Sequence, residues 1–180
     1  MTSSPHPIST LLVLALASIA AVTDLSRHKI YNWTTYPGIL SAFIVNALEP
    51  DGIGLSDSLT GFVACGGIML VAFTLFGLGG GDVKLMAMLG AGLGLRSGIE
   101  VLLWTFVLGA VVGISVLIWR IGCWRLVRRA GRQLYFLLRF GSWIPLTLGE
   151  RRQLQPRLHL APPALVAVLI VTFSLVDVWN

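Results

Sequence analysis

Two aspartates occupy positions where a carboxylate is costly. Asp24 follows an uncharged run that begins at Met1, and Asp82 opens another apolar stretch. A charge at the centre of a membrane helix costs about 2.5 to 3.5 kcal/mol, so such acids indicate a function. If their helices are neighbours, like-charge repulsion lets the pair hold a single proton. The ionised carboxylate can then activate water while the protonated one polarises a carbonyl and protonates the leaving amine. This chemistry hydrolyses peptide bonds and requires no metal and no cofactor.

Both acids also have a simpler interpretation. Asp24 and Asp82 could cap helices, or they could form interfacial ion pairs with Arg27 and Lys84, which stabilise a protein little. The three glycines at 79–81 favour catalysis, because backbone without side chains lets a second chain approach closely. Non-helical backbone at membrane depth is tolerated only where it lines a cavity. We therefore expect a substrate cavity beside Asp82.

The elements that must position these acids are membrane helices. Of the 180 residues, 56% are hydrophobic and only 12% are charged, whereas soluble domains carry roughly 25% charged residues. Several uncharged runs reach the roughly 20 residues that cross a bilayer. We predict an all-α polytopic membrane protein, a single domain over 1–180, with about six transmembrane helices. The predicted spans are 8–23, 30–48, 58–81, 82–99, 101–119 and 158–176.

Basic residues predict the orientation, because loops rich in lysine and arginine stay in the cytoplasm. With six spans, the turns at 27–29 and at Lys84 fall on the same side as residues 120–157. That segment holds nine arginines and one acid, which predicts a basic cytoplasmic or interfacial segment in contact with anionic lipids. Asp24 and Asp82 then both lie at the cytoplasmic level of the membrane.

Glycines four residues apart predict close contacts between helices in lipid, because small residues let backbones approach. These pairs are Gly77 with Gly81, Gly90 with Gly94, Gly94 with Gly98, and Gly109 with Gly113.

Metal and nucleic-acid binding are not expected. Cys65 and Cys123 stand alone, and His28 and His159 have no partner at ligand spacing. The pI of about 9.9 arises from arginines beside hydrophobic spans, which are typical of topology signals and lipid contacts. The sequence does not predict an oligomeric state.

The two acidic sites resemble the active-site motifs of the type IV prepilin leader peptidases, polytopic aspartyl proteases of bacterial membranes. The second motif of that family is Gly-x-Gly-Asp, which residues 79–82 match. Its first motif is an aspartate at the end of an apolar span, then basic residues, then Ile-Pro-Asn. Here Tyr31 replaces the proline. The resemblance covers about Ser9 to Trp119, and more weakly the last span, where Ala161, Pro162 and Pro163 are similar to a proline-containing stretch of the family.

The resemblance implies that Asp24 and Asp82 are the catalytic residues. It implies supporting roles for Gly79, Gly81, Lys84 and Asn32. Lys84 would position Asp82 or favour its ionised form, unless it is only a snorkelling lysine. Asn32 would hydrogen-bond near Asp24, unless it only caps the second helix.

The chain is most similar to the short, CpaA/TadV-like form of the family, which accompanies Flp-type pili. Larger members carry a cytoplasmic insert with paired C-x-x-C motifs, which is linked to methylation. Because this sequence has no such insert, we expect no N-methyltransferase activity. The implied substrate is a prepilin or pseudopilin, whose leader is cut at the cytoplasmic face of the bacterial inner membrane.

Two alternatives stay open. Intramembrane proteases of the presenilin or signal-peptide-peptidase kind also use Gly-x-Gly-Asp, but their first aspartate follows a tyrosine, whereas Thr23 precedes Asp24 here. A small proton-coupled transporter or accessory membrane subunit would use the same acids as proton carriers near the bilayer midplane. The placement of both acids at one membrane face favours a protease.

Overall fold

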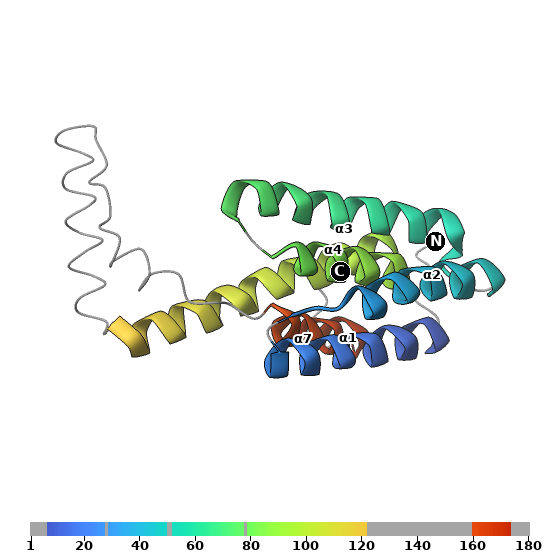
Figure 1. Cartoon of the computed structure of the whole chain (residues 1–180). Helices are drawn as coiled ribbons and strands as arrows, with labels where there is room; N and C mark the ends of the chain where they lie inside the picture. The colour runs from blue at the N-terminus through green and yellow to red at the C-terminus, as the bar shows by residue number, and fades with distance from the viewer. Residues whose placement is uncertain (1–6, 28, 50–51, 78, 122–159, 174–180) are drawn as a thin grey trace, which may run out of the picture. The chain divides into compact units, whose positions relative to one another are not determined.

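The computed structural model describes residues 7–27, 29–49, 52–77, 79–121 and 160–173. Within these ranges the chain is entirely helical and contains no strand (Figure 1). Its helices are α1 (Pro7–Arg27), α2 (Asn32–Leu48), α3 (Gly54–Phe76), α4 (Gly80–Ile121) and α7 (Ala161–Thr172). The prediction of an all-helical protein is confirmed.

Three helical stretches among the described residues are long and apolar enough to cross a membrane. They are Ile8–Arg27, Gly54–Leu75 and Gly80–Trp119. α7 is a shorter apolar helix of 12 residues. The number of six crossings is not confirmed, since the predicted spans 82–99 and 101–119 both belong to α4. The predicted basic segment 120–157 lies outside the described residues beyond Ile121.

α4 is broken at Gly94. This residue has φ 79° and ψ −175°, a backbone conformation that glycine adopts without the steric cost of a Cβ. A Cβ on Gly98 would lie only 3.0 Å from the Cα of Gly90. In a straight helix, eight residues would separate these positions by about 12 Å. The chain therefore folds back at Gly94, several residues before the boundary that the sequence predicts between the fourth and fifth spans.

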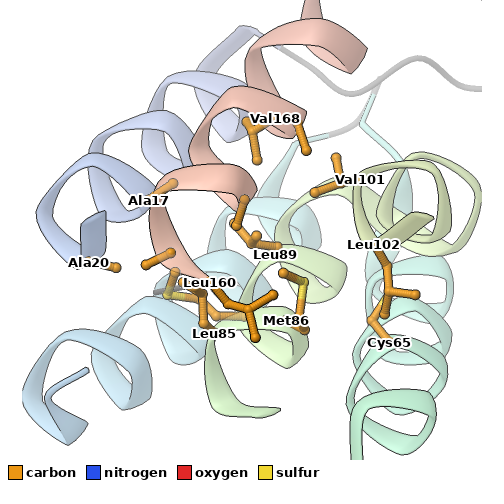
Figure 2. Close-up of a cluster of buried hydrophobic side chains, with 14 of the residues drawn as sticks. Ala17, Ala20, Cys65, Leu85, Met86, Leu89, Val101, Leu102, Leu160 and Val168 are labelled. Carbon is orange, nitrogen blue, oxygen red and sulfur yellow. The ribbon is translucent and has the colours of Figure 1, made fainter. Parts of the chain in front are cut away.

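The buried core lies among α1, α4 and α7, with a contribution from α3. Figure 2 shows side chains of these helices converging on one cluster, including Ala17, Leu89, Leu160, Val168, Leu102 and Cys65. α1 contacts both α7 and α2, and α2 in turn contacts α3. Small residues on α1 and α7 allow the close approach of these two helices.

A buried polar network stabilises the break in α4. Helix ends leave carbonyl groups without intrahelical partners, and Ala91 and Gly92 lie just before the break. Asn46 Nδ2 donates to the Ala91 carbonyl at 2.9 Å and to the Gly92 carbonyl at 3.4 Å. Ser58 Oγ also donates to the Ala91 carbonyl, while Ser9 Oγ donates to Asn46 Oδ1 at 2.8 Å. Side chains of α1, α2 and α3 thus form the network that satisfies the carbonyl groups just before the break in α4.

Asn46→Leu is expected to destabilise the protein by about 2 to 3 kcal/mol, because it removes the donor to the buried Gly92 carbonyl and one of the two donors to the Ala91 carbonyl. Denaturation of the purified protein in detergent measures the loss. Ser41→Ala is the matched control on the same helix, since Ser41 bonds only to the Gly38 carbonyl within α2. Equal stability of the two variants would contradict this role of Asn46.

The chain divides into two compact units. One comprises Met1–Leu108 and His159–Asn180, and the other is Gly109–Leu158. The core, the polar network and both aspartates belong to the first unit. The described part of the second unit, residues 109–121, is helical. A single domain over 1–180 stays a prediction.

Candidate active site

Asp24 lies on the buried face of α1, in its last turn. It is only 7% exposed. The same face carries apolar residues at helical spacing, all buried: Val13, Ala17, Ala20 and Ala21. The backbone N–H of Ala161, the first residue of α7, donates to Asp24 Oδ2 at 3.4 Å. The amphipathic pattern of α1 therefore carries one carboxylate into the protein, at the start of another helix.

Asp82 is the third residue of α4 and lies in the first turn of that helix. Its backbone N–H donates to the Gly79 carbonyl at 3.0 Å. Its carboxylate lies beside the same residue, since a Cβ on Gly79 would be 2.8 Å from Asp82 Oδ2. A carboxylate in the first turn of a helix is also typical of a helix cap. Gly79 and Gly80 are themselves exposed, so the carboxylate lies beside accessible backbone.

The structure places the two aspartates within electrostatic range of each other, although 58 positions separate them in the sequence. Gly81 contributes to this approach, because a Cβ at that position would lie 3.0 Å from Ile30 Cβ. Glycine therefore allows the connection between α1 and α2 to pack against the first turn of α4.

Lys84 and Asn32 contact each other, and their supporting roles beside Asp82 and Asp24 stay predictions. Lys84 Nζ donates to Asn32 Oδ1 at 2.8 Å and lies 4.9 Å from the centre of the Tyr36 ring. Tyr31, not Asn32, is the N-cap residue of α2, and it makes no side-chain capping bond. Asn32 thus joins α2 to α4 and does not cap its helix.

The ion-pair interpretation of the two acids finds no support in these contacts. Arg27 donates to the Tyr31 hydroxyl at 3.3 Å, and Lys84 donates to Asn32. The cations nearest in sequence to Asp24 and Asp82 are therefore engaged with neutral oxygens. Asp24 instead accepts a hydrogen bond from the backbone N–H of Ala161.

Sequence reasoning assigned no role to Ala161 or Tyr36. Ala161 acts through its backbone N–H, which no side-chain pattern reports. One signal was available: Pro162 and Pro163 are typical of a helix start, and helix starts attract carboxylates. Tyr36 gave no such signal, because its contact with Lys84 depends on how α2 and α4 pack.

The residues at this site suit acid–base chemistry on water and a carbonyl group. Two carboxylates that share one site can divide the roles of general base and general acid. Among the described residues, no group of three or more His, Cys, Asp or Glu side chains could hold a metal ion.

Fold and site together define a helical membrane protein with two interacting carboxylates at one end of its helices. The chain belongs to the type IV leader peptidase family, which its residues 11–114 match. The match includes both aspartates and ends before α7. No curated protein and no solved structure matches the chain. The family predicted from the two acidic motifs is therefore confirmed, and membership favours a protease over a transporter.

Proposed function

We propose that this protein is an aspartyl endopeptidase that removes the short leader from a prepilin or pseudopilin. The observation that carries the proposal is that Asp24 and Asp82, which belong to two separate motifs, lie within electrostatic range of each other. Asp24 is largely buried on α1, and Asp82 lies in the first turn of α4. Membership of the leader peptidase family supplies the substrate class.

In the proposed mechanism the two carboxylates share one proton. The ionised carboxylate takes a proton from a water molecule, whose oxygen attacks the carbonyl carbon of the scissile bond. The protonated carboxylate polarises the carbonyl oxygen in this step. When the C–N bond breaks, a carboxylic acid donates its proton to the departing amine. The chemistry requires only that both acids and the peptide bond meet.

The exposed backbone at Gly79 and Gly80 supports access for such a peptide. Both residues lie next to Asp82, and a Cβ on Gly80 would have only Phe73 nearby, at 4.0 Å. An extended substrate chain could therefore lie against this backbone, with its scissile bond directed at the two acids. Residues with larger side chains would occupy that space.

Aromatic side chains support a site at the membrane interface. Trp33 is 64% exposed and Tyr36 is 55% exposed, and tyrosine and tryptophan are enriched at the boundary between lipid and water. Lys29, Arg27 and Lys84 belong to the same end of the helices. Because basic residues favour the cytoplasmic side, we propose that the active site faces the cytoplasm from the bacterial inner membrane.

The short form of the family remains part of the proposal. The chain lacks paired C-x-x-C motifs, so we propose cleavage without N-methylation and a substrate of the Flp type. The nine arginines of residues 120–157 would contact anionic lipids.

Cleavage of a co-expressed Flp-type prepilin tests the function directly. The prepilin is expected to lose its leader only when this protein is present, which a gel-shift and the mass of the new N-terminus measure. A zinc chelator should leave cleavage unchanged. A prepilin that keeps its full mass beside well-inserted protein would contradict the proposal.

A further inference from the structure

The start of α7 lies against Asp24. Ala161 is the first residue of α7, and its N–H donates to Asp24 Oδ2 at 3.4 Å. Both residues are buried, with Ala161 1% exposed and Asp24 7% exposed. This contact joins positions 137 residues apart, and α7 lies beyond the part of the chain that matches the family.

The sequence of α7 leaves Asp24 few donors. The N–H groups of the N-cap residue and of the first three helical residues have no partner within a helix. In α7, Pro162 and Pro163 carry no N–H, so Leu160 and Ala161 are the donors left among these four, and it is the N–H of Ala161 that bonds to Asp24. The next N–H, that of Ala164, already donates to the Leu160 carbonyl at 3.0 Å. The positive end of the helix dipole and this one N–H therefore act together on Asp24.

Small side chains hold α7 at the distance that this hydrogen bond requires. The facing surfaces of α1 and α7 consist largely of buried alanines: Ala17, Ala20, Ala21, Ala161, Ala164 and Ala167. Such surfaces allow close backbone approach in lipid. Ala20 and Ala164 are both fully buried, so a larger side chain at either position would separate the helices.

We propose that the Ala161 N–H is a positioning group for catalysis by Asp24, which rests on the function proposed above. The N–H binds Oδ2 and fixes the rotamer of the Asp24 side chain. Oδ1 is then the oxygen that is directed at water and at Asp82. α7 thus completes an active site whose two acidic motifs lie on other helices.

Ala161→Pro tests the inference, because proline deletes the N–H while proline at a helix start is well tolerated. The kcat for leader removal is expected to fall about tenfold, with KM nearly unchanged and with wild-type levels of protein in the membrane. Ala161→Val adds similar bulk and keeps the N–H, so its kcat should stay several-fold above that of the proline variant. Equal kcat values for the two variants would overturn the inference.

A second measurement does not depend on a proline at position 161. In 15N-alanine-labelled protein in detergent, the amide resonance of Ala161 is expected to shift as Asp24 titrates. The shift should vanish in Asp24→Asn. An Ala161 resonance that does not respond to Asp24 would refute the contact.

These results separate the inference from the proposed function. If Asp24→Asn still removes leaders, the proposed function fails whatever the Ala161 resonance does. If Asp24→Asn is inactive but Ala161→Pro cleaves at the rate of the wild type, only the positioning role fails. A loss of stability in Ala161→Pro with unchanged kcat per folded molecule would also overturn it, because a purely structural contact predicts that outcome.

Discussion

Asp24→Asn is expected to abolish removal of a prepilin leader, and Asp82→Asn is expected to do the same. Asparagine keeps the size of each side chain but can neither accept a proton from water nor donate one to the leaving amine. General acid–base catalysis contributes about 10²- to 10⁴-fold to a rate, so each variant should lose at least 100-fold. The double variant should lose little more, because the two acids act as a unit.

The assay is a gel-shift of a co-expressed prepilin, with membrane fractions probed for the amount of each variant. Asp57→Asn is the matched control. It makes the same chemical change at a partly buried acid in the first turn of α3, away from the two aspartates. Full cleavage by either active-site variant would rule out the two-aspartate mechanism, provided that the membrane levels are equal.

Gly61→Leu is expected to prevent folding. Even a Cβ on Gly61 would lie 2.6 Å from the carbonyl carbon of Gly94 and 2.7 Å from its oxygen, and it would also meet the Gly90 carbonyl. These neighbours are backbone atoms, so rotation of a side chain cannot relieve the overlap. Overpacking of a core costs about 1 to 3 kcal/mol of stability. Because the larger side chain would also displace α3 from the break in α4, we expect this variant to lose about 3 kcal/mol or more.

Gly67→Leu on the same helix is the matched control, because a Cβ at Gly67 would have nothing within 4 Å. The measurement is the amount of each variant in the membrane and its thermal unfolding in detergent. We expect loss of Gly61→Leu and near wild-type behaviour of Gly67→Leu. If Gly61→Leu were as abundant and as stable as its control, the close contact between α3 and α4 would be wrong.

Glycine spacing predicted part of this contact. The pairs Gly90 with Gly94 and Gly94 with Gly98 were expected to allow close helix packing, and all three residues lie in tight contacts. Gly77 was also predicted to allow close helix packing. In the structure it ends α3 with φ 66°, and a Cβ there would have no described atom within 4 Å. The spacing rule could not distinguish packing from a helix end, because glycine serves both. Gly61, whose Cβ would overlap the backbone of Gly90 and Gly94, had no glycine four residues away.

The helices themselves were readable from the sequence, but the point at which α4 folds back was not. Hydrophobic runs predicted α1 and α2 well, because a membrane helix requires a long uncharged stretch. In α4, the charges of Arg96 and Glu100 predicted a division after residue 99, whereas the structure breaks the helix at Gly94. Gly94 breaks the helix because Asn46 and Ser58 bond the carbonyl groups that the break leaves open. Those donors come from other helices.

The sequence by itself determined the membrane character of this protein and its two acidic motifs, because scarce charge in an apolar chain makes individual carboxylates visible. It also determined the family, through the spacing of those motifs. Only the tertiary structure decided that Asp24 and Asp82 lie within electrostatic range of each other, that Lys84 binds Asn32, and that Ala161 binds Asp24. Each of these contacts joins residues far apart in the chain. They depend on which helix faces pack together, and hydrophobicity alone does not specify that choice.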